Sequence, residues 1–134
     1  MPSDAKPIAT TEAEAGIIGY IYSVVRDGKF VTVTAAVENT TNAPYMPSAW
    51  NDRMDRTKPY TLLGSYLIDK QNALRYPVLR DTDNNCVCTV PFGPMDPKEK
   101  RSIFLTFKAP ESDRVDVQIG KMAAKPVTIT KAGS

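Results

Sequence analysis

The sequence predicts an all-β protein in which two sheets pack on each other, and three observations support this fold class. Short runs that are either apolar throughout or apolar at alternate positions recur at 30–37, 62–68, 103–107 and 115–119. No stretch carries a convincing helical period, so the apolar faces of the strands are left to pack on one another. Turn residues, including eleven prolines, stop each run early, which is typical of short strands joined by many loops.

Size and composition favour one globular domain with a two-layer core. The chain has 134 residues, of which 42% are hydrophobic and 24% charged, which is ordinary for a folded protein. The net charge is +2 and no basic stripe is interleaved with aromatic residues, so no nucleic-acid partner is expected. The apolar runs are too short to cross a bilayer and no signal peptide is visible, so no membrane insertion is expected either.

The two ends of the chain are expected to flank a single domain. Residues 1–15 are polar and small and predict a flexible tail or linker that could include a short first strand. Residues 131–134 predict a short C-terminal tail, which leaves 16–130 as the domain. This organisation is typical of a mature domain cut from a longer polypeptide, to which Met1 has been added.

Two hairpins are predicted from runs that flank turn residues. Residues 16–25 and 30–38 are joined through Asp27-Gly28, a dipeptide that tolerates the positive φ of a tight turn. Residues 62–68 and 74–79 flank a polar turn, and Pro77 makes the second run an edge strand or a bulged one. Further strands are expected at 86–90, 102–107, 115–119 and 127–130, for about eight in all.

The alternation within these runs predicts which side chains face the core. In the first hairpin, Val31, Val33, Ala35 and Val37 share one face. The inward positions of the later strands are expected to be Ile103, Leu105 and Phe107, then Val115, Val117 and Ile119, with Asp116 and Gln118 facing outward.

Several segments, taken in order, resemble a known family. They are 31–39 (VTVTAAVEN), 63–69 (LGSYLID), 76–81 (YPVLRD) ahead of 86–88 (CVC), 95–102 (MDPKEKRS), 105–110 (LTFKAP) and 115–119 (VDVQI). They resemble bacterial extracellular domains of unknown function, related in fold to secreted immunoprotective antigens. In some envelope proteins a similar module precedes a peptidoglycan-anchoring domain. The resemblance spans residues 16–130 and implies an exported, non-catalytic, immunoglobulin-like antiparallel β-sandwich of about seven to nine strands, while its motifs say little about function.

Cys86 and Cys88 are the two cysteines of the chain. On a regular strand their Cα atoms would lie about 6.5–7 Å apart, near the upper limit for a disulfide, so a bridge requires a local bend. We expect a small structural disulfide here. Two alternatives remain: a redox-active pair, which lacks a histidine or helix N-terminus to lower a thiol pKa, and a metal site, which would need further ligands from carboxylates or a second chain.

No catalytic residues are predicted, and an enzyme is not expected. The chain contains no histidine, which removes the commonest general base and the Ser-His and Cys-His systems. The turn at 81–85 resembles the opening of a calcium loop, but Cys86 stands where the glycine belongs and Phe92 where the bidentate glutamate belongs. We therefore interpret it as a polar hairpin turn, and expect no metal and no cofactor.

The irregular segment 39–60 is the candidate for partner binding, because long loops in compact domains are often functional. It carries aromatic, methionine and arginine residues, the types that favour interfaces. In the alternative interpretation, Trp50 and Tyr60 tuck under the loop and close the core. The candidate residues are Tyr45, Met46, Trp50, Arg53, Met54, Arg56 and Tyr60.

Taken together, these observations predict a non-catalytic module, exported to the cell envelope or secreted. We expect it to bind another protein or a cell-wall polymer, or to act as a spacer. The alternative is a redox-active or metal-handling protein that uses Cys86 and Cys88.

Overall fold

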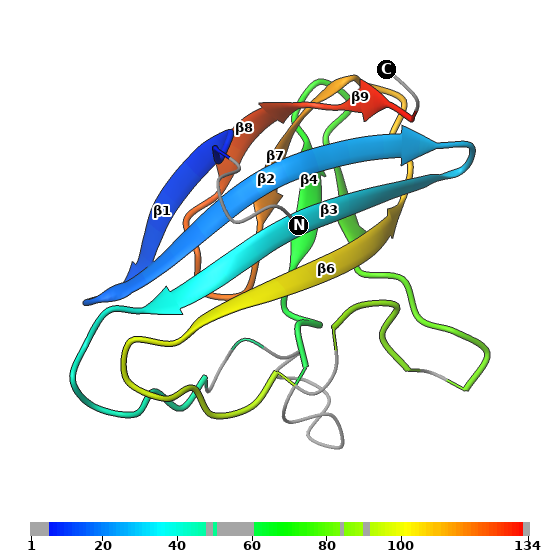
Figure 1. Cartoon of the computed structure of the whole chain (residues 1–134). Coiled ribbons are helices and arrows are strands. Elements are labelled where there is room, and N and C mark those ends of the chain that lie inside the picture. The colour runs from blue at the N-terminus through cyan, green and yellow to red at the C-terminus, as the bar shows by residue number, and fades with distance from the viewer. Residues whose placement is uncertain (1–5, 48–49, 51–60, 84, 90–91, 133–134) are drawn as a thin grey trace.

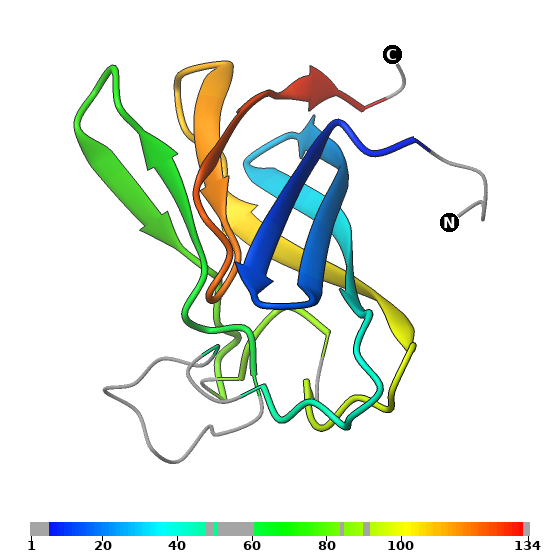
Figure 2. The same ribbon diagram turned by 90° about the vertical axis from the view of Figure 1, so that its left-hand side faces the viewer.

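The computed structural model describes residues 6–47, 50, 61–83, 85–89 and 92–132, which form two sheets packed on each other (Figures 1 and 2). No helix occurs in the described part of the chain. The all-β, two-sheet prediction is thereby confirmed. The strands are β1 (Ala9–Glu14), β2 (Ile17–Asp27), β3 (Phe30–Asn39), β4 (Tyr66–Asp69), β5 (Leu74–Pro77), β6 (Lys100–Lys108), β7 (Arg114–Gln118), β8 (Lys125–Thr128) and β9 (Thr130–Lys131).

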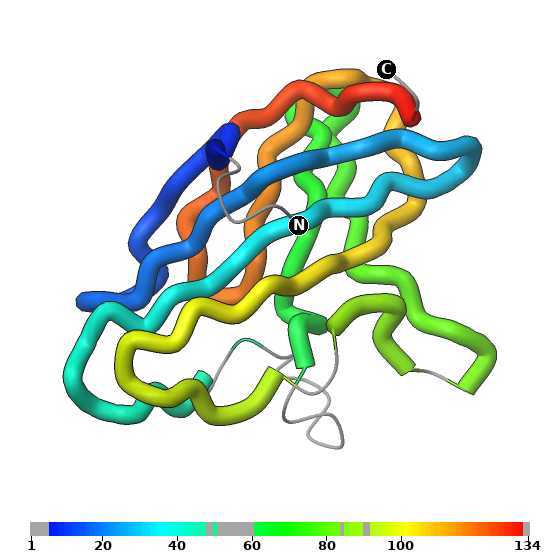
Figure 3. The backbone as a smooth tube through the Cα atoms, viewed as in Figure 1, coloured from blue at the N-terminus to red at the C-terminus, as the bar shows by residue number. Residues whose placement is uncertain are grey.

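The two sheets are built from strands that are not consecutive in the chain. The first sheet has the order β1-β2-β3-β6, and the second has the order β5-β4-β7-β8. All of these neighbours pair antiparallel, whereas β9 pairs parallel to the end of β2. The chain therefore passes from one sheet to the other after β3, β5, β6 and β8, and Figure 3 shows the last crossing along the rim of the molecule.

Both predicted hairpins are confirmed. Asp27 pairs with Phe30 at the tip of the first hairpin, where Gly28 adopts a φ of +62°. A register shift between Ile21 and Ser23 places a bulge in β2. In the second hairpin β5 is an edge strand, as Pro77 predicted.

The strand predicted over 62–68 is shorter than expected and begins at Tyr66. Leu62 and Leu63 are buried in the core from a turn instead, and the Gly64 amide donates a hydrogen bond of 2.9 Å to the Trp50 carbonyl oxygen. The backbone of this turn is therefore hydrogen-bonded to the loop residue Trp50, and not to a neighbouring strand.

In the described part of the strand predicted over 86–90, which ends at Thr89, pairing is limited to isolated bridges from Cys86 to Arg80 and from Cys88 to Leu105. The segment still lies along the outer edge of β6, because the Thr106 amide donates to the Val87 carbonyl oxygen at 3.0 Å.

The core lies between the two sheets, and the predicted inward residues occupy it. Val31, Val33, Ala35 and Val37 of β3 are buried, as are the alternate apolar residues of β6 and β7. Asp116 alternates with the inward Val115 and Val117, in agreement with the predicted facing. It is nevertheless only 8% exposed, and its carboxylate forms an ion pair of 2.9 Å with Lys70 Nζ.

The N-terminal segment 1–15, expected to be a tail that could hold a first strand, contains β1. This strand pairs with β2 from Ala9 opposite Ile21 to Glu14 opposite Ile17. Its second edge lies beside β8 (Figure 2), so β1 and β8 face each other across one seam between the sheets.

Candidate binding surfaces

Cys86 and Cys88 form a disulfide, with Cα atoms 5.3 Å apart. This separation is shorter than the two-residue repeat of a regular strand, so the backbone has the local bend that such a bridge requires. Cys88 is 6% exposed and packs into the core cluster, whereas Cys86 lies at its margin. The bridge therefore sits at the border between the core and the outer edge of β6.

In the part of the chain that the structure describes, no group of three or more histidine, cysteine, aspartate or glutamate side chains could hold a metal ion. The turn before the bridge is held from within, because Asp81 Oδ1 accepts hydrogen bonds of 2.9 Å from the amides of Asp83 and Asn85.

Trp50 is the centre of a closed cluster at the loop end of the molecule. Its side chain is 0% exposed, and its ring lies 5.0 Å from that of Phe92. Gly120 faces the indole with a φ of +53°, and a Cβ at this position would overlap the ring. Of the two interpretations of Trp50, the geometry agrees with the one in which it closes the core.

Polar contacts join this cluster to Glu14 at the end of β1. Trp50 Nε1 donates a hydrogen bond of 2.8 Å to Tyr45 Oη, and Tyr45 Oη donates in turn to Glu14 of β1. Lys121 forms an ion pair of 3.3 Å with the same carboxylate. Burial, together with the hydrogen bond to Glu14, raises the pKa of Tyr45 above its ordinary value. We call Tyr45, Trp50, Phe92 and Gly120 the plug.

The remaining residues of the predicted recognition loop fall into two groups. Met46 is 53% exposed and lies outside the plug. Arg53, Met54, Arg56 and Tyr60 lie outside the described residues. In the described part of the loop, Met46 is thus the large apolar side chain that faces solvent. The aromatic residues Tyr45 and Trp50 pack against the core or within it.

A second group of aromatic residues, which the loop-centred prediction missed, lies on the outer face of the first sheet. Tyr20 and Tyr22 of β2 have ring centroids 6.3 Å apart. Register places Tyr20, Ala36 and Ser102 in one row across β2, β3 and β6. Phe104 lies beside Thr34 in a separate row on the same side, opposite the core. Phe104 is 45% exposed. We call Tyr20, Tyr22, Glu38, Lys100 and Phe104 the aromatic face.

Charged groups order the tyrosine side of the aromatic face. Tyr20 Oη donates a hydrogen bond of 2.6 Å to Glu38 Oε1. This bond, together with burial, raises the pKa of Tyr20 to about 12. Lys100 Nζ lies 4.4 Å from the ring centroid of Tyr20 and 5.7 Å from that of Tyr22, within the range of cation–π attraction. The aromatic face therefore carries the charges of Glu38 and Lys100 beside its tyrosines, at the end away from Phe104.

The signal that could have located this face is the strand alternation itself. Phe104 stands between the inward residues Ile103 and Leu105, so period two places it on the opposite side. Tyr20 stands beside the inward Ile21 in the same way. Tyr22 could not have been placed, because the bulge between Ile21 and Ser23 breaks the alternation there.

Comparisons with known proteins leave the family of this chain open. No family model matches the sequence, and neither the curated proteins nor the solved structures contain a match. Among the described residues, no helix is long and apolar enough to span a membrane.

Proposed function

We propose that this chain is a non-catalytic, exported module with an immunoglobulin-like sandwich that binds a partner protein through the aromatic face. The observation that carries the proposal is the exposure of Phe104 on the same sheet face as a stacked tyrosine pair. No strand of the described residues covers this face. Aromatic residues with a polar rim are the composition that distinguishes protein interfaces from the remaining surface.

The strand order supports an immunoglobulin-like topology. In that fold one sheet holds strands A, B, E and D, and the other holds G, F and C, with C′ added beside C in the variable type. The order β2-β3-β6 matches A-B-E, and the order β8-β7-β4-β5 matches G-F-C-C′. The segment around Val87 lies beside β6 where strand D would lie beside E. β1 is then an addition at the outer edge of A.

The disulfide supports export. Disulfides persist in oxidising compartments and are rare in the cytosol, and the bond between Cys86 and Cys88 closes too small a loop to contribute much stability by itself. Intact mass under non-reducing conditions, with and without alkylation, tests this part. A mass two hydrogens short of the reduced chain and unchanged by alkylation supports export, whereas two rapidly alkylated thiols favour the redox alternative.

Site-specific photo-crosslinking tests the binding surface. A photoreactive phenylalanine analogue replaces Phe104 on the aromatic face or, as a matched control, Leu74 on the outer strand of the second sheet, which is similarly exposed at 50%. We expect a discrete crosslinked protein from position 104 and none from position 74. Equal crosslinking at both positions, or none at either, would favour a spacer. Crosslinks to polysaccharide would favour a cell-wall ligand.

A further inference from the structure

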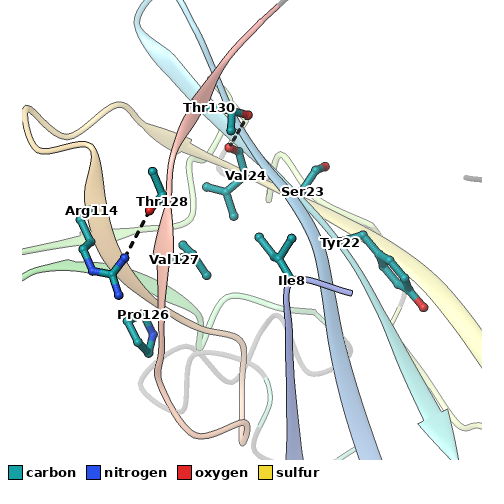
Figure 4. A pocket seen from close by; sticks show the side chains of 9 residues that line it. All are labelled: Ile8, Tyr22, Ser23, Val24, Arg114, Pro126, Val127, Thr128 and Thr130. Atoms are coloured by element: carbon teal, nitrogen blue, oxygen red, sulfur yellow. Dashed lines mark hydrogen bonds between the residues drawn. The ribbon is translucent and has the colours of Figure 1, made fainter. Parts of the chain in front are cut away.

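The seam between the two sheets holds a groove that meets the aromatic face at Tyr22 (Figure 4). It has a volume of about 410 Å³, within the range of ligand sites. Val24 and Val127 form its apolar floor, with Ile8 at the side and Arg114 and Thr128 at the rim. Tyr22 belongs to both surfaces, because it lines the margin of the groove while its ring points away from the floor in Figure 4.

The groove lies where backbone pairing along β2 is interrupted. The Ile8 amide donates to the Ile21 carbonyl oxygen at 2.7 Å, which ends the contact with the first strand. Pairing with β9 begins only at Val25. The bulge after Ile21 lies between the part of β2 that pairs with β1 and the part that pairs with β9. Residues 22–24 of β2 therefore lie in the gap between β1 and β9.

The opposite wall of the groove is the outer edge of β8. The Ile129 amide donates to the Asp113 carbonyl oxygen at 2.7 Å, and hydrogen-bonded pairs alternate along an antiparallel ladder. Pro126 and Thr128 are therefore at non-bonded positions relative to β7, and their backbone groups point to the outer edge. Pro126 has no amide hydrogen to offer there, but Thr128 has both a donor and an acceptor.

The charge at the rim is positive. Arg114 is the charged member of the groove lining, and its Nη1 donates to Thr128 Oγ1 at 3.3 Å. With respect to the described residues, most of its five donors remain for a ligand. The neighbouring carboxylates are engaged elsewhere, because Asp113 forms an ion pair with Arg26 at 3.2 Å and Asp116 pairs with Lys70. The charge of the rim therefore favours a ligand that carries a negative group, such as a carboxylate.

We propose that the groove binds an extended acidic peptide segment of a partner protein, which adds to the outer edge of β8. Its backbone bonds to Thr128, an acidic side chain pairs with Arg114, and an apolar side chain covers Val24, Val127 and the exposed Ile8. This is strand addition to a sheet edge, in which the backbone supplies affinity and the side chains supply selectivity. The contacts of this peptide are with Arg114 and Thr128, whereas the proposed function depends on Phe104, so either proposal can fail alone.

Amide chemical shifts of the isotope-labelled protein, titrated with the synthetic peptide acetyl-TVDVT-amide, test this site. We expect saturable shifts at Val24, Thr128 and Thr130, with a Kd of about 1 mM. Acetyl-TVKVT-amide should bind about threefold or more weakly, the size of effect that an exposed ion pair gives. Arg114→Glu should reverse this preference, and Lys108→Gln, on a distant edge, should leave it unchanged.

Thr128→Pro removes the outward amide while keeping a residue that an edge strand tolerates. We expect this variant to lose peptide binding with the shifts of β3 unchanged, which shows that the fold is intact. Equal binding of the acidic and basic peptides, or shifts confined to other surfaces, would overturn the proposal. So would the absence of saturable shifts up to about 10 mM peptide. Concentration-dependent broadening at Thr128 without peptide would assign the edge to a second copy of this chain instead.

Discussion

The plug and the aromatic face are both built from aromatic side chains, but they use them in opposite ways. In the plug, Trp50 is fully buried and donates to Tyr45, which donates to Glu14. On the aromatic face, Phe104 is exposed and the tyrosines lie over a sheet that is already complete. The difference follows from topology, because a sandwich needs side chains to close its ends but needs none on its outer faces. Exposed aromatic residues on the sheet therefore call for a functional explanation, whereas those of the plug have a structural one.

The largest effect is expected from Trp50→Ala. Removal of a fully buried aromatic side chain costs both transfer free energy and a cavity, about 3–5 kcal/mol, and Phe92 and Gly120 would lose their packing partner. Urea unfolding measures the change in the free energy of unfolding. A loss below about 1 kcal/mol would place Trp50 outside the core and remove the contrast between the plug and the face.

A smaller but clear loss is expected from Tyr45→Phe. The ring stays, but the hydroxyl that joins Trp50 Nε1 to Glu14 is lost, and a buried donor left without a partner costs about 1–3 kcal/mol. Met46→Ala, next in the chain and exposed, serves as the control and should change stability by less than about 0.5 kcal/mol. If the two variants are equally stable, the polar anchoring of the plug is wrong.

Alkaline pH should destabilise the protein through one tyrosine of the plug, Tyr45, and one of the aromatic face, Tyr20. The pKa of Tyr20 is raised to about 12 and that of Tyr45 is raised above its ordinary value, whereas an unfolded tyrosine has a pKa of about 10. Their stabilising contribution is complete below pH 10 and is lost as the pH rises toward the folded pKa, because the unfolded chain releases protons first.

Unfolding curves between pH 8 and pH 12 measure this effect. Tyr20→Phe and Tyr45→Phe should each make the free energy of unfolding fall less steeply above pH 10, and the double variant should show the shallowest fall. An unchanged slope in the double variant would show that other groups set the alkaline limit.

The smallest effect on stability is expected from Phe104→Ser, which alters the aromatic face without opening the core. We expect a change within about 0.5 kcal/mol, together with the loss of partner binding. Circular dichroism melting measures the first, and crosslinking from a photoreactive group at the neighbouring position 102 measures the second. A stability loss comparable to that of Trp50→Ala would reassign Phe104 to a structural role.

The sequence predicted those parts of the fold in which burial and alternation agree. Phe107 and Val33 stand in regular strands, so period two placed them in the core correctly. Leu62 was assigned to a strand because its apolar neighbours suggested one, but its burial comes from a turn that bonds to Trp50. Local pattern carries no information about such a long-range partner.

The candidate site was harder to predict than the fold. Tyr45 and Trp50 are candidate binding residues in the sequence because they lie in a long loop. Their structural partners Glu14 and Gly120 are distant in sequence, so the sequence does not reveal these contacts. Phe104 is not among the predicted site residues, because the pattern of its strand is defined by the inward residues Ile103 and Leu105. Composition indicated that aromatic residues matter here, whereas only the packing of the two sheets distinguishes those that close the core from those that face solvent.

The bend at Cys86 and Cys88 also has a consequence for how the protein behaves at high concentration. The outer edge of β6 meets a short, crosslinked segment whose Cα spacing of 5.3 Å is too tight for a regular strand. Such a segment cannot present the straight row of amides and carbonyls onto which another chain would pair. The bridge thus makes this border of the sheet a poor template for aggregation, a form of protection that adds little to the stability of the monomer and acts between molecules.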